Sequence, residues 1–195
     1  MRAALCIGGD TPRPETIARL VRGVDIVAAA DSGFDYLYDL GILPDLIVGD
    51  MDSTRYGSEI EKIAAQHGRG PNTEVEFTSS EKDETDTEIG LRRLRERGAE
   101  HIILIGGGGG RLDHLLGLVI LFERETRPDR WHTGKDLVIS IDGRREFSGM
   151  EGSTVSLFPV GKGRCRLKSS GLKWPLDELV WERGDAGISN LVVSE

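Results

Sequence analysis

The sequence predicts an α/β domain with a mostly parallel sheet, followed by a small all-β domain. Two observations predict this fold class. Up to about residue 134, short apolar segments alternate with segments whose apolar residues have helical spacing, as in βαβ units. From Leu137 onward this spacing is lost, and short β-rich segments are separated by turn residues. We therefore expect two domains, residues 1–134 and residues 135–195.

Five short apolar segments of the first domain are expected to be strands. They are residues 3–7, 26–30, 46–48, 75–77 and 102–105. Glycine or aspartate follows most of them at once, as in Gly8-Gly9-Asp10 and Asp31-Ser32-Gly33. Open α/β sheets bind their ligands just past the carboxyl ends of the strands, so these turns form the candidate site.

Helices are expected between these strands. Their expected positions are a segment that begins at Pro14 and residues 34–40, 58–68, 85–97 and 115–122. Ser58 with Glu61, and Thr85 with Glu88, have the spacing of a capping box. The helix at 115–122 is apolar nearly all round, so we expect it at the centre of the fold or in a subunit interface.

The second domain contains only short segments with the composition of strands. Their expected positions are residues 138–141, 155–158, 164–168 and 191–193. Asp142-Gly143 is typical of a tight hairpin turn. These segments predict an antiparallel β module of about sixty residues.

Two aspartates, Asp50 and Asp52, follow the apolar segment 46–48 after a single glycine. In an extended chain alternate side chains share a face, so both carboxylates would point the same way. Like charges in this position repel unless a cation or a hydrogen-bond network lies between them. Oxygen ligands of this kind suit Mg²⁺ that also holds a substrate phosphate. The alternative is an aspartate-rich turn, which further acidic segments downstream make less favoured.

A second acidic segment spans residues 81–88 and contains Lys82, Asp83 and Asp86. With Thr85 as the cap, Asp86 would lie in the first turn of the following helix. Acids at a helix start also offset the helix dipole, so this segment taken alone is an ordinary charged helix start.

Five glycines, residues 106–110, lie between an expected strand and an expected helix. Their backbone amides are expected to be free to approach an anion, which makes the loop a candidate phosphate cradle. The loop is no P-loop, because the Gly-Lys-Ser/Thr ending is missing.

Composition argues against some classes of partner. The chain of 195 residues has a net charge of −8 and no evident basic stripe, which argues against nucleic acid and anionic membranes. Cys6 and Cys165 form no metal-binding spacing, so a reducing, cytoplasmic setting is expected. The apolar run at the amino terminus is too short for a signal peptide or a membrane span.

Several of these segments match one family in order and spacing. The matching segments are Asp31-Ser32-Gly33, Gly49-Asp50-Met51-Asp52-Ser53, residues 81–86, residues 109–114, residues 171–176 and Ile188-Ser189-Asn190. Over almost its whole length the chain resembles the thiamine pyrophosphokinase (thiamine diphosphokinase) family. The resemblance implies a Rossmann-like ATP-binding domain, a thiamine-binding β-sandwich domain, and a homodimer with active sites shared between subunits.

The resemblance also implies a reaction and roles for the matching residues. In the family, the thiamine hydroxyl attacks the β-phosphorus of ATP, which gives thiamine diphosphate and AMP. The implied catalytic acids are Asp31, Asp50, Asp52 and Asp86. The last three are also the implied Mg²⁺ ligands. The residues implied to bind ATP are Asp31, Ser32, Ser53, Lys82, Asp83, Thr85, Gly109 and Arg111.

For thiamine, the implied residues are Asp113, Trp174, Ser189 and Asn190. Thiamine carries a cationic thiazolium ring, which an acid and an aromatic face both attract. Pro175 and Gly171 flank Trp174 and favour a loop position, although most tryptophans are core residues.

Two other functions stay open. One is a regulatory protein that binds thiamine or a nucleotide with little turnover, and the other is a pyrophosphokinase for another hydroxymethyl heterocycle. The chain departs from the family pattern at Leu118, where an asparagine is common, and at Glu195, where relatives continue through another strand. The intact set of acids favours the enzyme.

Overall fold

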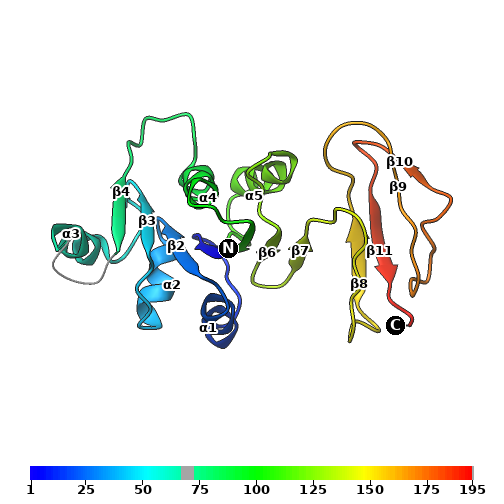
Figure 1. The fold of residues 1–195 in the computed structure, drawn as a ribbon, viewed down its shortest axis with the longest axis horizontal. Coiled ribbons are helices and arrows are strands. Elements are labelled where there is room, and N and C mark those ends of the chain that lie inside the picture. Colours follow the sequence, from blue (N-terminus) through cyan, green and yellow to red (C-terminus); the bar gives the residue numbers. More distant parts are fainter. Residues whose placement is uncertain (67–72, 195) are drawn as a thin grey trace. The chain divides into compact units, whose positions relative to one another are not determined.

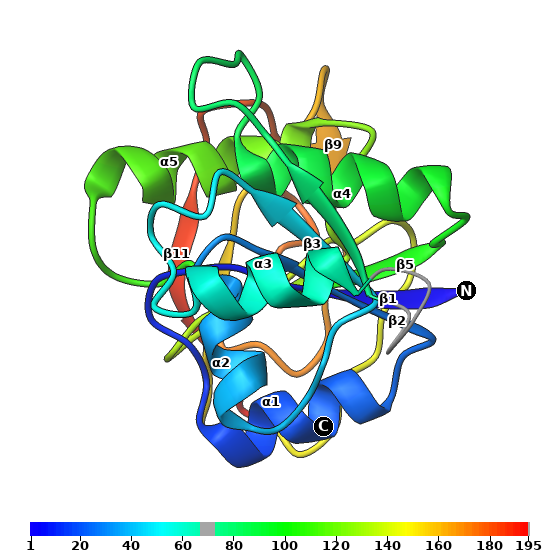
Figure 2. The same cartoon turned by 90° about the vertical axis from the view of Figure 1, so that its left-hand side faces the viewer.

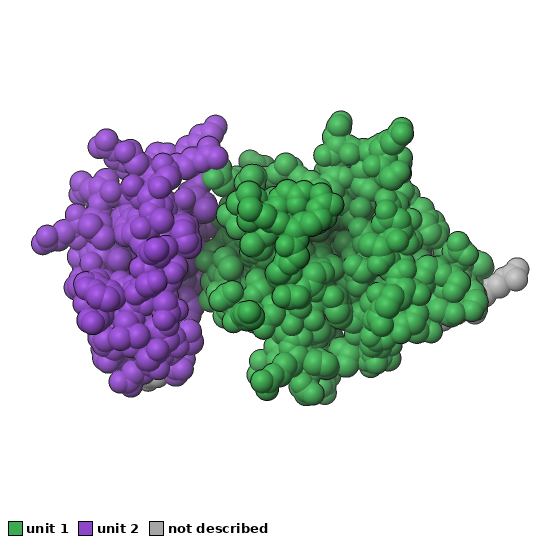
Figure 3. Space-filling model, turned by 180° about the vertical axis from the view of Figure 1, so that it is seen from behind, with its two compact units in different colours: residues 1–140 green, residues 141–195 purple. Residues whose placement is uncertain are grey.

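The computed structural model describes residues 1–66 and 73–194. The chain forms two compact units, residues 1–140 and residues 141–195 (Figure 3). The second unit contains eight basic and eight acidic residues, so the first unit carries the whole net charge of −8. The excess of negative charge therefore lies entirely in the first unit, which contains the acidic segments.

A seven-stranded sheet forms the centre of the first unit (Figure 1). Its strands are β1 (Arg2–Cys6), β2 (Ile26–Ala30), β3 (Leu46–Gly49), β4 (Glu74–Phe77), β5 (His101–Ile105), β6 (Arg130–His132) and β7 (Leu137–Ile139). Their order is β4-β3-β2-β1-β5-β6-β7, and every neighbouring pair is parallel except β6 and β7. The five expected strands are confirmed, and their carboxyl ends meet at one edge of the sheet.

Helices cover both faces of this sheet (Figure 2). They are α1 (Pro14–Arg22), α2 (Gly33–Asp39), α3 (Gly57–Ala65), α4 (Asp86–Glu96) and α5 (Leu112–Ile120), which the short 3₁₀ helix η1 (Leu121–Glu123) follows. Because side chains alternate along a strand, Leu5 of β1 packs in one core with α4, and Cys6 packs in the other core with α1 and α2. Burial on both faces explains why the inner strands β1, β2, β3 and β5 are almost wholly apolar.

One of the two expected capping boxes is confirmed. Thr85 caps α4: its hydroxyl accepts a hydrogen bond from the Glu88 amide at 3.2 Å, and the Glu88 carboxylate accepts one from the Thr85 amide at 2.7 Å. The capping box expected at Ser58 is wrong, because α3 begins one residue earlier, at Gly57, with Tyr56 in the cap position. The expected end of that helix, Gly68, lies outside the described residues.

The strand expected to open the second domain belongs to the first unit. β7 pairs with β6 through Trp131 and Val138 and forms an edge of the large sheet, and the division between the units follows Ser140. The hairpin expected at Asp142-Gly143 is wrong, since no strand follows it before β8 (Thr154–Leu157). A short apolar segment carries no local signal that tells which sheet it will join.

The second unit is built from two small antiparallel sheets. In one, β8 pairs with β11 (Gly187–Leu191), and in the other, β9 (Cys165–Arg166) pairs with β10 (Val180–Trp181). The expected fold class, a mostly parallel α/β unit followed by a small antiparallel β unit, is confirmed.

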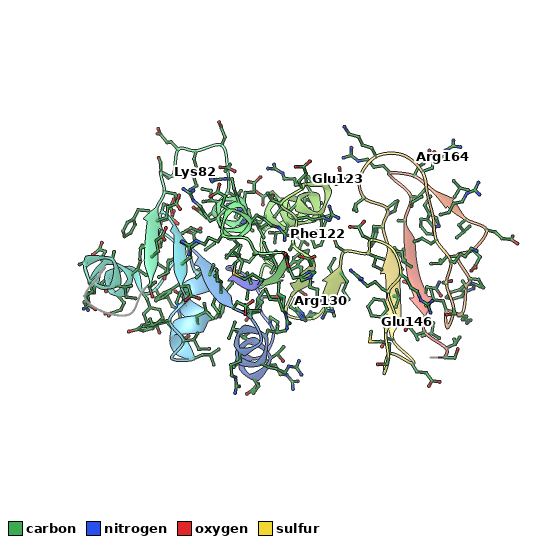
Figure 4. All side chains as sticks on the ribbon, viewed as in Figure 1. Lys82, Phe122, Glu123, Arg130, Glu146 and Arg164 are labelled. Carbon is green, nitrogen blue, oxygen red and sulfur yellow. The ribbon has the colours of Figure 1, made fainter. Side chains whose placement is uncertain are left out.

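A short basic row lies along the segment that contains β9. Lys162, Arg164, Arg166 and Lys168 alternate with apolar or small residues and are all exposed, and Figure 4 labels Arg164. The expectation of no basic stripe is therefore wrong for this segment. Across the sheet, Arg164 forms an ion pair with Glu182 at 3.3 Å.

Helix α5 lies at the surface of the first unit. Leu112, Leu116, Val119 and Ile120 are each more than half exposed, whereas Leu118 is buried. A position at the centre of the fold is therefore wrong for this helix, and the subunit interface stays a prediction. In the described part of the chain, no helix has the length and apolarity needed to cross a membrane.

Candidate active site

Four aspartates come together at the carboxyl edge of the large sheet. Asp31 follows β2, Asp50 and Asp52 follow β3, and Asp86 begins α4 after the loop from β4. Because β2, β3 and β4 are neighbours in the sheet, these positions lie side by side. The structure thus gathers all four expected catalytic acids.

The electrostatics of Asp31 show how close these acids are. Burial, together with the nearby carboxylates of Asp86 and Asp50, raises the pKa of Asp31 to about 7. Asp31 Oδ1 is buried and has no hydrogen-bond partner among the described residues. The backbone of Asp31 has a φ of 46°, in the left-handed region that aspartate tolerates better than most residues.

Asp86 is held by two partners from the β4–α4 loop. Thr78 donates a hydrogen bond to Asp86 Oδ1 at 2.7 Å, and Lys82 Nζ lies 3.0 Å from Asp86 Oδ2. Lys82 also donates to the Thr78 hydroxyl and to the Ser79 carbonyl, so its ammonium is fixed among the acids (Figure 4). It supplies a positive charge inside an otherwise acidic group.

The backbone at Asp50 and Asp52 differs from the extended chain that the sequence predicts. Met51 has a φ of 64°, so the alternation that would align the two carboxylates does not hold there. Instead, Asp50 Oδ1 accepts a hydrogen bond from the Asp52 amide at 3.2 Å, as in an Asx turn. The charge of Asp50 still raises the pKa of Asp52, followed by smaller effects that include Asp86.

Gly49 allows the close contact between β3 and Asp31. A Cβ placed on Gly49 would overlap the Asp31 carboxylate, and the φ of Gly49 is 145°. Only glycine fits a backbone that approaches another chain segment this closely with a positive φ. The glycine therefore lets Asp31 sit against the strand that carries Asp50.

The donor set fits Mg²⁺ that a substrate also helps to hold. The acids offer hard carboxylate oxygens, and their mutual repulsion together with the unpartnered Asp31 Oδ1 would be relieved by a cation. Among the described residues, however, no three His, Cys, Asp or Glu side chains converge as a ready-made metal cage. Mg²⁺ characteristically binds one or two carboxylates and completes its coordination with water and substrate phosphates.

The glycine loop offers fewer free amides than the sequence predicts. The amides of Gly106, Gly107 and Gly108 donate to the carbonyls of His132, Gly8 and Asp10 respectively. The expectation that all five amides are free is therefore wrong, because the loop is hydrogen-bonded to the turn after β1 and to the last residue of β6. Gly109 and Gly110 are exposed, and no hydrogen bond from their amides appears in the described part of the chain.

The other residues expected to bind ATP occupy several different positions. Ser32 precedes α2, and its hydroxyl lies against Gly8 at the end of β1. Ser53 and Asp83 are exposed in the loops after β3 and β4. Arg111 forms an ion pair with Asp113 at 2.5 Å, and this pair holds the pKa of Asp113 at about 2.

Three of the residues expected to bind thiamine gather in the second unit. Trp174 is 54% exposed, which agrees with a loop position, and Lys173 Nζ lies 4.8 Å from the centre of its ring. Asn190 is buried, and its amide group both donates to the Trp174 carbonyl at 2.7 Å and accepts from the Trp174 amide at 3.2 Å. Ser189 is exposed next to it, with a φ of 61°. Asn190 thus fixes the backbone on which Trp174 is displayed.

Sequence reasoning missed Thr78 and Asp35. Thr78 follows β4 directly, so its place at the carboxyl end of a strand was the signal for its contact with Asp86. Asp35 is buried in α2 and binds the loop that follows Asp52. One helical turn separates it from Asp31, but no local pattern shows that its partners are Thr54 and Arg55.

The fold and the site define a class of protein: a parallel α/β unit with an acidic site at the carboxyl edge of its sheet, joined to a small antiparallel β unit. Two family models match this chain. One describes the thiamin pyrophosphokinase catalytic domain and matches residues 17–130, and the other describes the thiamin pyrophosphokinase vitamin B1 binding domain and matches residues 138–195. The chain belongs to the thiamin pyrophosphokinase family.

Individual relatives agree with this assignment. Thiamine pyrophosphokinase from Bacillus subtilis (strain 168) is 34% identical over 154 residues, which cover 75% of this chain and 68% of the relative. Thiamine pyrophosphokinase 2 from Arabidopsis thaliana is 29% identical over 165 residues, 78% of this chain, and the match spans only 60% of the plant protein. The same holds for Thiamine pyrophosphokinase 2 from Oryza sativa, which is 26% identical with 60% of its length matched.

Solved structures confirm the fold. The crystal structure of thiamine pyrophosphokinase from Bacillus subtilis covers 100% of this chain and 91% of its own, with a TM-score of 0.69 and 21% identity. That of yeast thiamin pyrophosphokinase covers 99% of this chain and 80% of its own, with a TM-score of 0.68 and 19% identity.

Proposed function

We propose that this protein transfers the pyrophosphoryl group of ATP to the hydroxyl of thiamine, which gives thiamine diphosphate and AMP. The observation that carries this proposal is the group of four aspartates at the edge of the large sheet, in a chain whose two parts match the two family models. Transfer of a phosphoryl group needs mainly positioning and neutralisation of charge, and acids that hold a metal next to a lysine meet that need.

The acids divide into a metal-binding set and a supporting residue. Asp50, Asp52 and Asp86 would hold Mg²⁺, which neutralises the charge on the ATP phosphates when it is bound. Asp31 would not bind the metal itself; it would support these three acids and help to bind the nucleotide. Lys82 fixes Asp86 in the ligand-free protein and lies within reach of an incoming phosphate.

The remaining contacts to ATP come from the turns around this group. Gly109, with a positive φ and an exposed backbone, can approach a phosphate, and Arg111 adds a guanidinium at the start of α5. Further contacts are proposed for Ser32, Ser53, Asp83 and Thr85.

Thiamine would be bound by Asp113, Trp174, Ser189 and Asn190. The exposed indole of Trp174 offers a face to the cationic thiazolium, and stacking on a cation contributes roughly 1–2 kcal/mol when water is excluded. Asn190 acts through the backbone of Trp174, and Asp113 supplies a negative charge.

In this proposal the protein is a homodimer, and each active site takes its acids from one chain and Trp174 from the other. The exposed apolar row on α5, with Leu112, Leu116 and Val119, supports an association of subunits. In the same proposal, residues 1–140 bind ATP, residues 141–195 bind thiamine, and the location is cytoplasmic. The two free cysteines, Cys6 and Cys165, suit a reducing compartment.

The test is a product analysis of purified protein incubated with MgATP and thiamine. We expect thiamine diphosphate and AMP in equal amounts. ADP with thiamine monophosphate would contradict the proposed reaction. Binding of both substrates without product would favour the regulatory protein, and turnover only with another hydroxymethyl heterocycle would favour the other pyrophosphokinase.

A further inference from the structure

Asp35 is the most deeply buried charged residue that the structure describes. Only 5% of the residue is exposed, and it lies on α2, one turn after Asp31. Burial of a carboxylate is unfavourable unless hydrogen bonds or an opposite charge compensate it. The hydrogen-bond donors that contact Asp35 therefore compensate its burial, and they identify the segment that Asp35 holds in place.

The Asp35 carboxylate accepts three hydrogen bonds from one short segment. Oδ1 accepts from the Thr54 hydroxyl at 2.5 Å, and Oδ2 accepts from the Arg55 amide at 3.2 Å and from Arg55 Nε at 3.0 Å. Thr54 and Arg55 are the second and third residues after Asp52. The carboxylate thus binds both the backbone and the side chains of the loop that carries the paired acids.

A second carboxylate on the same face of α2 holds the end of this loop. Asp39, one turn after Asp35, binds Arg55 at 2.8 Å and accepts a hydrogen bond from the Tyr56 hydroxyl at 2.5 Å. The ring of Tyr56 packs 4.6 Å from that of Tyr38, also on α2. Asp39 is half-exposed, so the buried Asp35 is the firmer of the two attachments.

The loop needs such an attachment. Met51 has a left-handed backbone with a φ of 64°, which is unfavourable for a non-glycine residue and persists only where the surroundings enforce it. Asp50 and Asp52 repel each other across one intervening residue. Both effects favour another loop conformation, and the bonds from Asp35 oppose them.

The start of α2 is in turn fixed against the sheet. A Cβ on Gly33 would overlap the Cys6 carbonyl of β1, so the helix begins in direct contact with the central strand. Asp31 and Asp35 therefore lie on one segment, which is packed closely against β1. Asp35 connects the segment that carries Asp31 to the loop that carries Asp50 and Asp52.

We propose that Asp35 is a positioning residue, which holds the Asp50–Asp52 loop through Thr54 and Arg55 in the arrangement that receives Mg²⁺ with the nucleotide. It touches neither substrate nor metal. This inference rests on the proposed function as far as the metal and ATP are concerned, whereas the hold on the loop is a property of the ligand-free chain.

The first measurement uses the ligand-free full-length protein. In Asp35→Ala, we expect backbone amides between residues 50 and 56 to exchange hydrogen at least tenfold faster than in the wild type, while the amides of β1 and β5 keep their rates. Asp45→Ala is the matched control, because Asp45 binds the Val27 amide at 2.8 Å at the opposite end of β3. Unchanged exchange at 50–56 in a folded Asp35→Ala protein would overturn the inference.

The second measurement titrates Mg²⁺. Loss of a residue that orients metal ligands typically costs 10–100-fold in metal affinity, so Asp35→Ala should raise the Mg²⁺ concentration for half-maximal ATP binding, measured by calorimetry, by at least tenfold. Asp35→Asn keeps an oxygen for Thr54 but loses the charge that faces Arg55, and it should lie between the wild type and Asp35→Ala. A purely structural role would lower the melting temperature and leave the Mg²⁺ titration unchanged, which would overturn the inference.

Should Asp35→Ala fail to fold, Thr54→Val tests the same attachment with a smaller change, because Asp35 keeps its two bonds from Arg55. It removes one donor at nearly constant volume, and we expect a shift of the Mg²⁺ titration of about threefold in the same direction. If the wild type binds MgATP but forms no thiamine diphosphate, the proposed function fails and the positioning role is still decided by exchange and titration. If the wild type is active and neither variant changes exchange or titration, the positioning role alone fails.

Discussion

At the scale of single residues, the site is a set of carboxylates brought close enough to repel one another. Asp31 has a pKa of about 7 because burial, Asp86 and Asp50 all disfavour its charged form. Lys82 compensates only part of this charge, through its ion pair with Asp86. The site is thus arranged to gain a cation, and its function should depend on individual acids.

Asp50→Asn and Asp52→Asn should each lower turnover by about a hundredfold or more, because a metal that loses a charged ligand loses several kcal/mol of charge stabilisation. Steady-state assays at saturating ATP and thiamine measure the change, and circular dichroism checks that the fold is kept. Asp25→Asn, which changes a carboxylate bound to the Arg2 amide at the amino edge of the sheet, is the control. Near-normal Mg²⁺-dependent activity in both site variants would exclude these acids as metal ligands.

The sequence was sufficient to find these acids but not their geometry. The positions of Asp31, Asp50 and Asp52 follow from the rule that ligands bind past the carboxyl ends of parallel strands, whereas the role of Asp86 was implied only by the resemblance to the family. The left-handed backbone of Met51 and the hold of Asp35 on Thr54 depend on contacts between segments far apart in sequence. For the same reason the bonds from Gly106–Gly108 to the neighbouring turns could not be foreseen from a run of glycines.

At the scale of helices and strands, local composition predicts most elements. Strands β1, β2, β3 and β5 are short, mostly apolar segments followed by turn residues, and α4 begins with a capping box that the sequence shows directly. The predictions fail where contacts with a distant segment determine the structure. β7 pairs with β6 in the large sheet, and Tyr56 rather than Ser58 precedes α3. The packing of Tyr56 on Phe34 and Tyr38 carries no local signal.

The capping box of α4 should contribute measurably to stability. Thr85→Ala removes the side chain that accepts from the Glu88 amide, and loss of such a cap lowers the free energy of unfolding by about 0.5–2 kcal/mol. Urea denaturation measures it, with Thr85→Ser as the control that keeps the hydroxyl and should stay close to the wild type. Equal losses in both variants would mean that the methyl group, not the cap, is what matters.

His132 on β6 should make stability depend on pH. Burial, followed by the charges of Arg130 and Arg19, lowers the pKa of His132 below 6.5, and its Nε2 has no partner among the described residues. Between the folded pKa and 6.5 the unfolded chain binds more protons than the folded one, so stability falls as the pH drops below about 6.5.

The variant His132→Gln lacks this titration. The difference in unfolding free energy between wild type and variant should therefore shift against the wild type as the pH falls below about 6.5, and be constant above it. Urea denaturation at a series of pH values measures this difference. Parallel stability curves across the whole range would show that protonation of His132 does not oppose folding.

At the scale of the whole molecule, the expected catalytic and thiamine-binding residues are divided between two units. The acids belong to residues 1–140, whereas Trp174, Ser189 and Asn190 belong to residues 141–195. In the proposed dimer, each active site combines the acids of one chain with Trp174 of the other chain. Activity measurements on mixed subunits test this division.

Mixing two impaired variants tests the shared site, at a thiamine concentration too low to saturate Trp174→Ala, which is expected mainly to weaken thiamine binding. If Asp52→Asn and Trp174→Ala subunits form mixed dimers, one site receives both lesions and the other receives none, so a mixed dimer should recover about half the activity of the wild-type dimer. Subunit exchange is verified with differently labelled chains. Should exchange be complete and no activity return, each site would draw all its residues from one chain.

The fate of the phosphorus atoms tests the proposed reaction most directly. With ATP labelled at the γ-phosphorus and thiamine carrying heavy oxygen in its hydroxyl, the proposal predicts thiamine diphosphate that contains both labels, together with unlabelled AMP in equal amount. Thiamine monophosphate carrying the phosphorus label, with ADP as the second product, would show that attack falls on the γ-phosphorus and would contradict pyrophosphoryl transfer.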